Sequence, residues 1–159
     1  LALGEKGLKT VAEISVLNTN YIVKKLGKVR GFELPYGRGK PRKHECVFSA
    51  SPMKRDTKVK ALNVAKRLLD FGIHAPTMYF PLIVHEALMI EPTETATKEQ
   101  LDEFIEALSR ISEEAYNNPE VVLSAPHNTS VTRLDEAMAA RPKTLFLTWK
   151  MYLEKVGKK

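Results

Sequence analysis

The chain has 159 residues, of which 43% are hydrophobic and 28% are charged, and its net charge is +6 at pH 7. This composition is typical of a folded globular domain and argues against a wholly disordered chain. The longest uncharged apolar run, residues 75–84, is too short to span a bilayer, and the single cysteine excludes an internal disulfide framework. We therefore expect one domain, or one domain with a trailing piece, in a reducing, cytoplasmic setting without a membrane partner. Because Leu1 is not a start methionine, we also expect the sequence to be a piece of a longer protein.

Positive charge is concentrated in one part of the chain. Residues 24–60 include twelve basic and three acidic side chains, so this stretch carries +9 and the remainder carries −3. A basic segment on a mildly acidic body favours a negatively charged partner, such as a nucleic acid, a phosphate or an acidic protein.

Residues 4–27 predict one long helix, because apolar side chains from Leu8 to Ile22 recur at the helical spacing. The apolar face is broad, which indicates contact with more protein than this sequence supplies. Gly27 is expected to end the helix in the left-handed conformation.

Loop, strand and helix signals alternate in the next part of the chain. Residues 30–43 hold three glycines, two prolines and five basic residues, and they predict a loop. A short strand is expected within residues 44–50, followed by a helix that Thr57 caps and Gly72 ends. An extended segment at 73–81 and a second strand at 87–90 complete this part.

Thr97 and Gln100 form the pattern of a capping box, and the residues after them predict a helix with a buried apolar stripe that ends before Pro119. A third strand is expected at residues 120–123. Two further helical patterns, 132–140 and 144–156, are separated by Pro142. Together these elements predict an α/β sandwich with three short strands and four or five helices.

Several candidate chemical motifs are incomplete. His44-Glu45 lacks the second histidine of a zinc-binding HExxH helix, and the four histidines form no i, i+4 pair, so no metal site is expected. Gly37-Arg-Gly-Lys40 lacks the rest of a phosphate-binding loop and is interpreted as a solvated basic loop. Cys46 is interpreted as a small buried side chain rather than as a nucleophile.

Two segments combine polar and rigid residues beside predicted strands. Residues 72–81 place His74, Thr77, two aromatic residues and two prolines between a helix and a strand. Residues 89–94 place Glu91, Thr93 and Glu94 after an apolar strand. Polar loops between rigid elements often carry chemistry, whereas the alternative is ordinary turn and helix-cap structure. The residue pattern leaves both interpretations open.

The same segments carry a resemblance to a known family. The run Ala65-Lys-Arg-Leu-Leu-Asp-Phe-Gly-Ile-His-Ala-Pro-Thr-Met-Tyr-Phe-Pro81 and the run Met89-Ile-Glu-Pro-Thr-Glu94 resemble the C-terminal region of glycine dehydrogenase (decarboxylating). This family is the P-protein of the glycine cleavage system. Ser15-Val-Leu-Asn-Thr-Asn-Tyr21 and Thr132-Arg-Leu-Asp-Glu136 also match, and the continuation Phe80-Pro-Leu-Ile-Val84 is similar to subunit 2 of the two-subunit form.

The resemblance implies a fold and an activity. The fold is the C-terminal small domain (residues 30–159) of a fold-type-I enzyme that depends on pyridoxal phosphate (PLP), with a short, roughly three-stranded sheet covered by helices. Residues 1–29 correspond to a linker helix from the large domain. The parent enzyme releases CO2 from glycine and passes the aminomethyl group to lipoylated H-protein. The Schiff-base lysine of the family lies upstream, so the fragment is expected to be inactive and to hold no catalytic residue.

The resemblance also implies partners and site residues. Subunit 1, the lipoylated H-protein and the glycine cleavage complex are the expected partners. The candidates for lining the active-site cleft are His74, Thr77, Glu91, Thr93 and Glu94. The candidates for docking an acidic H-protein are Arg38, Lys40, Arg42 and Lys43. The alternative is a stand-alone basic module that binds nucleic acid or another partner. Nucleic acid is disfavoured, because the basic loop offers only Phe32 and Tyr36 for stacking.

Overall fold

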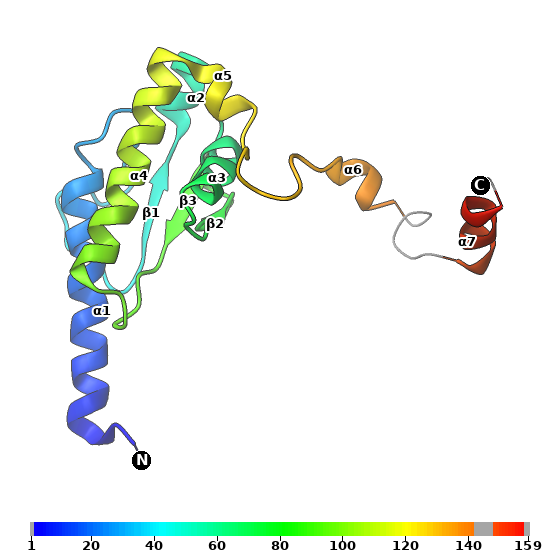
Figure 1. The fold of residues 1–159 in the computed structure, drawn as a ribbon. Coiled ribbons are helices and arrows are strands. Elements are labelled where there is room, and N and C mark those ends of the chain that lie inside the picture. The colour runs from blue at the N-terminus through cyan, green and yellow to red at the C-terminus, as the bar shows by residue number, and fades with distance from the viewer. Residues whose placement is uncertain (1, 142–147, 158–159) are drawn as a thin grey trace. The chain divides into compact units, whose positions relative to one another are not determined.

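The computed structural model describes residues 2–141 and 148–157, and the chain forms two compact units, Leu1–Thr129 and Ser130–Lys159. The first unit contains three strands: β1 (Cys46–Ser49), β2 (Thr77–Met78) and β3 (Ala87–Ile90) (Figure 1). Its helices are α1 (Gly4–Leu26), α2 (Ser51–Thr57), α3 (Ala61–Asp70), α4 (Lys98–Asn117) and α5 (Pro119–Leu123). The second unit contains α6 (Glu136–Ala139) and α7 (Trp149–Val156). None of the helices in the described ranges has the length and apolar character needed to cross a bilayer.

The strands form one antiparallel sheet in the order β1-β3-β2, so the fold is the predicted combination of a small sheet with helices. Cys46 pairs with Ile90 and Phe48 with Leu88, and all four side chains are buried. They share one face of the sheet because side chains alternate along a strand. Met89, between two of them, lies half-buried on the opposite face. This pattern is typical of an antiparallel sheet with one face covered by the core.

The helix α4 organises the first unit, because it packs against α1, α2, α3 and α5. Its predicted capping box is confirmed: the Thr97 hydroxyl accepts the N–H of Gln100, and the Gln100 side chain accepts the N–H of Thr97 at 2.9 Å. The predicted apolar stripe runs from Leu101 to Ile111, and both of these residues are buried. Phe104 is only half-buried, and it leaves part of its ring accessible at the cavity described below.

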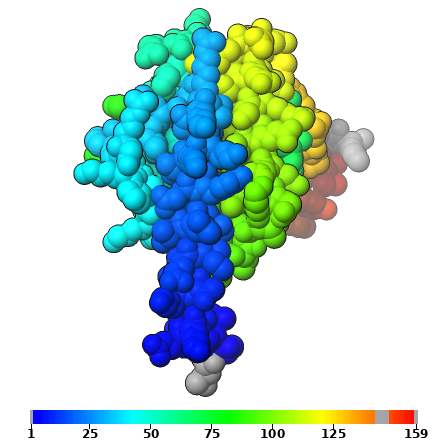
Figure 2. All heavy atoms as spheres, turned by 90° about the vertical axis from the view of Figure 1, so that its left-hand side faces the viewer, coloured from blue at the N-terminus to red at the C-terminus, as the bar shows by residue number. Residues whose placement is uncertain are grey.

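The helix α1 contacts the rest of the first unit along its C-terminal half. The N-terminal half extends past the other elements of the unit, and its Leu8 is 61% exposed (Figures 1 and 2). Leu17, on the C-terminal half, is 67% exposed. Gly27 follows the helix with φ −62°, so the predicted left-handed stop is wrong. The N–H of Gly27 instead donates to the carbonyl of Val23 at 3.1 Å and closes a last turn that needs no positive φ. The buried residues of α1 are Ser15, Asn18, Thr19, Ile22 and Leu26.

The helix predicted from its cap at Thr57 to Gly72 begins later, at Ala61, and a separate helix that was not predicted, α2, comes before it. Pro52 lies in the first turn of α2, Thr57 is the last residue of that helix, and Lys58 follows in the left-handed conformation with φ 66°. The helix α3 begins at Ala61, whose N–H donates to the carboxylate of Glu86 at 2.8 Å. The prediction for Thr57 is wrong because other groups satisfy the start of α3: the Glu86 carboxylate, which is distant in the sequence, and the Asn63 side chain, which accepts the N–H of Lys60 at 2.8 Å.

Glu86 connects three parts of the first unit. Its side chain is 7% exposed, and its other carboxylate oxygen lies 2.6 Å from Nζ of Lys54 on α2. Its backbone carbonyl accepts the N–H of Ala50 at 2.9 Å. The buried charge is therefore paired, as buried carboxylates in folded proteins generally are.

The third strand predicted at residues 120–123 is wrong. This segment belongs to α5, in which Pro119 occupies the first turn, where the missing N–H of proline removes no helical hydrogen bond. A short apolar run does not distinguish a strand from a helix by its periodicity. The third strand is instead β2, within the segment that the sequence predicts as extended.

In the second unit, α6 occupies only four of the residues 132–140, and α7 spans the last part of the predicted 144–156 helix. Residues 144–147 of that helix lie outside the described residues. The side chains of Asp135 and Thr148 accept backbone N–H groups at the start of α6 and α7, at 2.8 Å and 3.2 Å. These caps explain why the helices begin where they do.

Candidate functional site

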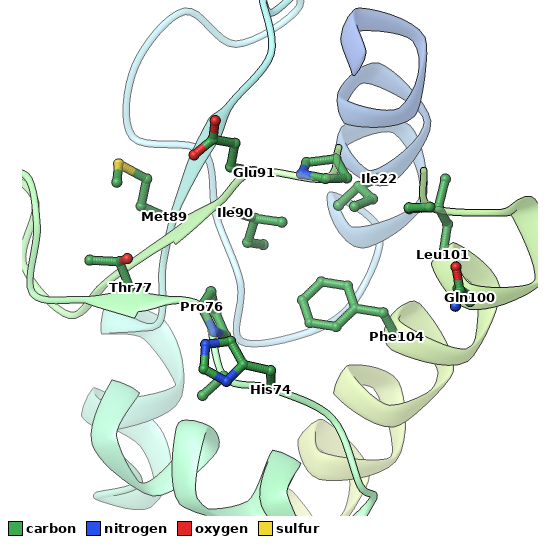
Figure 3. A pocket seen from close by; sticks show the side chains of 13 residues that line it. Ile22, His74, Pro76, Thr77, Met89, Ile90, Glu91, Gln100, Leu101 and Phe104 are labelled. Atoms are coloured by element: carbon green, nitrogen blue, oxygen red, sulfur yellow. The ribbon is translucent and has the colours of Figure 1, made fainter. Parts of the chain in front are cut away.

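A cavity of about 330 Å³ opens between the loop after α3, the end of β3 and the helices α1 and α4. Side chains from three separate elements, Ile22, Ile90 and Phe104, point toward the same space (Figure 3). The cavity brings together residues 72–81 and 89–94, the two polar segments that the sequence analysis singled out. The described residues of its lining are Ile22, His74, Ala75, Pro76, Thr77, Met89, Ile90, Glu91, Pro92, Ala96, Gln100, Leu101 and Phe104.

Three of the five predicted cleft residues line this cavity: His74, Thr77 and Glu91. All three are exposed, so they are accessible from solvent. His44, from the segment before β1, places its Nε2 3.8 Å from Oε1 of Glu91.

The other two predicted cleft residues, Thr93 and Glu94, are not among the described residues of the lining. The carbonyl of Thr93 accepts the side-chain amide of Asn18 at 2.9 Å, and its hydroxyl lies 2.7 Å from the hydroxyl of Thr95. Glu94 is half-buried in the same loop. The structure thus puts both residues in the segment that connects the cavity wall to α4.

Three consecutive polar residues of α1 hold the segments around the site. Asn18, 8% exposed, donates to the carbonyls of Thr93 and Ala96 at 2.9 and 3.2 Å. The Thr19 hydroxyl donates to the carbonyl of His44 at 2.7 Å. Asn20 exchanges two hydrogen bonds with the backbone of residue 42, at 2.8 and 2.9 Å. The sequence analysis missed these residues as site residues, although polar side chains on the buried face of a helix are a signal for such contacts.

The predicted docking residues lie on the loop between α1 and β1. Arg38, Lys40 and Lys43 are exposed. Arg42 is half-buried, and its guanidinium donates to the carbonyls of Tyr36 and Gly37, the latter at 2.9 Å. Arg42 therefore closes the turn of its own loop, whereas the other three cations face solvent.

Cys46 is buried in the core, and burial raises the pKa of its thiol to about 12. A thiol with this pKa is uncharged at neutral pH and is a poor nucleophile, as the sequence analysis expected. Within residues 2–141 and 148–157, no group of three or more histidine, cysteine or acidic side chains is arranged to hold a metal ion.

The site residues fall within a segment that matches a known family. Residues 11–132 match the family model described as glycine dehydrogenase, C-terminal domain. The chain is similar to the probable glycine dehydrogenase (decarboxylating) subunit 2 of Thermococcus onnurineus, with 64% identity over 96% of this chain. The proteins of the same name from Pyrococcus furiosus and Staphylothermus marinus are 65% identical over 96% and 54% identical over 100% of this chain. The chain spans about 30% of the length of each of these relatives.

A solved structure has a related fold. The crystal structure of glycine decarboxylase (P-protein) of the glycine cleavage system, in inhibitor-bound form, superposes with a TM-score of 0.57 at 23% identity. The superposition covers 69% of this chain and 23% of that one. Together with the family match over residues 11–132, this fold confirms the resemblance found in the sequence. The chain belongs to the family of glycine dehydrogenase C-terminal domains.

Proposed function

We propose that this chain is the C-terminal part of a glycine decarboxylase subunit, subunit 2, that works with subunit 1 in the glycine cleavage complex. The assembled enzyme would release CO2 from glycine and transfer the remaining aminomethyl group to the lipoylated H-protein in the cytoplasm. PLP, the cofactor of this enzyme class, supplies an electron sink for the bond cleavage. The observation that carries the proposal is the 64% identity, over 96% of this chain, to a protein named for this activity.

The cofactor belongs, in this proposal, to the part of the enzyme that precedes the chain. A covalently held PLP needs a lysine, and its phosphate needs cations or clustered N–H donors. Among the described residues that line the cavity there is no lysine and no arginine, and Glu91 adds negative charge. The cavity therefore does not fit PLP, and we expect the chain by itself to be catalytically inactive.

The chain's own contribution is to form one wall of the substrate cleft and to connect it to the rest of the subunit. His74, Thr77 and Glu91 offer a titratable ring, a hydroxyl and a carboxylate beside one cavity. Thr93 and Glu94 would hold the adjoining loop in position. Residues 1–29, which include α1, would link this domain to the preceding large domain, and the exposed Leu8 and Leu17 support that assignment.

The exposed cations of the basic loop give a docking surface for the H-protein, taken as an acidic partner. Arg38, Lys40 and Lys43 face solvent, so they can attract an acidic surface over several ångströms, and salt would weaken that attraction. Arg42 would act mainly by holding the loop that presents the other three. Equal affinity for the H-protein at low and at high salt would refute this part of the proposal.

The activity is tested with the complete two-subunit enzyme, PLP, lipoylated H-protein and glycine labelled at its carboxyl carbon. We expect labelled CO2 from the complete enzyme and none from the 159-residue chain alone. His74→Ala should lower the rate, whereas His85→Ala, which changes an exposed histidine outside the described lining, should leave it unchanged. Absence of labelled CO2 from the complete enzyme would refute the proposed function.

A further inference from the structure

The strand β1 lies at one edge of the sheet, and its outer side is only partly covered. Glu33 pairs there with Ser49 through backbone hydrogen bonds of 2.8 and 3.0 Å. Because backbone groups alternate sides along a strand, Val47, two residues before Ser49, also points its N–H and C=O away from β3. Pro35 would lie opposite Val47 in a longer ladder, but proline has no N–H to donate. Among the described residues, no backbone group bonds Val47 on this outer side.

A groove of about 200 Å³ adjoins this free edge, because Val47 is part of its lining. Tyr36 from the basic loop and Ile83 from the loop between β2 and β3 also line the groove, and they are 59% and 72% exposed. Arg42 and Glu45 add opposite charges to the lining. The volume is below the range of about 300–1,000 Å³ that is usual for small-molecule sites, so the groove suits a single apolar side chain better than a free ligand.

The charge around the groove selects the kind of partner. Arg38, Lys40 and Lys43 are exposed on the loop that carries Tyr36. Edge-to-edge pairing of two copies of the chain would bring two of these basic loops together, and their like charges would repel, whereas an acidic segment is attracted. Positive charge and proline also protect sheet edges against aggregation, but such protection does not explain why two apolar side chains stay exposed at the groove.

We propose that an extended, acidic segment of a partner protein adds to the outer edge of β1 and places one aliphatic side chain in this groove. One residue of the segment exchanges two backbone hydrogen bonds with Val47, as in other cases of strand addition. Its side chain then lies on the same face of the sheet as the side chain of Val47. The inference rests on the proposed function only in taking the partner of the basic loop to be acidic.

The probe is a blocked peptide, acetyl-Asp-Glu-Thr-Ile-Thr-Glu-Asp-amide, and its binding to the purified two-subunit protein is measured by calorimetry or by ligand-observed NMR. A methyl group on the backbone nitrogen of its isoleucine removes the donor to Val47 and should weaken binding by about tenfold. The same methyl group on the following threonine removes an N–H that faces away from β1, so the affinity should stay within about twofold. Replacing the acidic residues by their amides, or raising the salt concentration, should also weaken binding.

Two adjacent side chains provide matched variants of the protein. Ile83→Ser shortens a side chain that lines the groove and should weaken the peptide by about tenfold. Leu82→Ser makes the same kind of change at a residue that is 85% exposed and outside the described lining, so it should leave the affinity unchanged. Val47→Pro removes the outward N–H without removing a donor to β3, and it should weaken binding by about tenfold. The methylated peptides bind the unaltered protein, so they test the inference even where a variant fails to fold.

The outcomes separate this inference from the proposed function. Equal losses for the two methylated peptides overturn the inference, because the affinity would not depend on the N–H that faces Val47, and so does failure of the peptide to bind. A single-stranded oligonucleotide that displaces the peptide and binds more tightly would assign the basic loop to nucleic acid and would overturn it as well. Each of these results leaves the release of CO2 from glycine standing. Conversely, peptide binding with the expected methylation pattern supports the inference even if the complete enzyme releases no CO2.

Discussion

Asn18 is the residue whose loss should most clearly disturb the cavity wall. Its side-chain amide donates to the carbonyls of Thr93 and Ala96. Asn18→Ala removes this donor from both carbonyls. Because Asn18 is only 8% exposed, little water can replace the lost donor. A hydrogen bond contributes about 0.5–1.5 kcal/mol net, so the variant should lose about 1–3 kcal/mol of unfolding free energy. With a urea dependence of about 2 kcal/mol per molar, the unfolding midpoint falls by about 0.5–1.5 M.

The matched control is Asn20→Ala. Asn20 exchanges two hydrogen bonds with the backbone of Arg42 and donates a third to the carbonyl of Val16, but it is half-buried and does not hold the cavity wall. Urea unfolding followed by circular dichroism gives the stability of both variants, and amide hydrogen exchange shows where the structure loosens. Asn18→Ala should accelerate exchange at residues 91–101, and Asn20→Ala at residues 36–44. A midpoint for Asn18→Ala within about 0.2 M of wild type, with unchanged exchange at 91–101, would refute the reasoning.

Three further predictions concern buried polar groups. Burial raises the pKa of Asp70, but the backbone N–H groups of residues 127–128 and the Arg67 guanidinium outweigh it and hold this pKa below its usual value. The stability that the ionised Asp70 carboxylate contributes is present above about pH 4 and is lost as the pH falls through its lowered pKa. Asp70→Asn should therefore weaken the dependence of the unfolding free energy on pH in acid. Cys46, with a pKa of about 12, should react with a thiol reagent such as dithionitrobenzoate only after unfolding in urea. Glu86→Gln replaces a buried paired carboxylate and should cost about 1–3 kcal/mol in urea unfolding, whereas a loss below about 0.3 kcal/mol would contradict its role.

The parts of the fold that were predicted correctly depend on neighbours in the sequence. Thr97 and Gln100 lie three residues apart, so the start of α4 can be inferred from the pattern alone. The strands around Phe48 and Leu88 are short apolar runs bounded by polar residues, and they lie where expected. The family resemblance also depends on runs of adjacent residues, and the comparisons confirm it.

Some features of the fold that the sequence did not predict depend on contacts between distant parts of the chain. The start of α3 is satisfied by Glu86, 25 residues beyond the first residue of that helix. The strand β2 has only two residues, Thr77 and Met78, and is defined by pairing with β3 rather than by an apolar pattern of its own. The site shows the same limit: the sequence identifies the polar segments 72–81 and 89–94, but it does not show that α1 and α4 add Ile22, Leu101 and Phe104 to the same cavity.

The position of α1 connects these observations. Asn18, Thr19 and Asn20 hold the cavity loop, the segment at His44 and the basic loop from adjacent positions of one helix. Consecutive residues of a helix are fixed relative to one another, so a displacement of α1 would act on all three segments together. The N-terminal half of the same helix is exposed in this chain, so a partner that displaced this half would act on the cavity and on the basic loop through a single element.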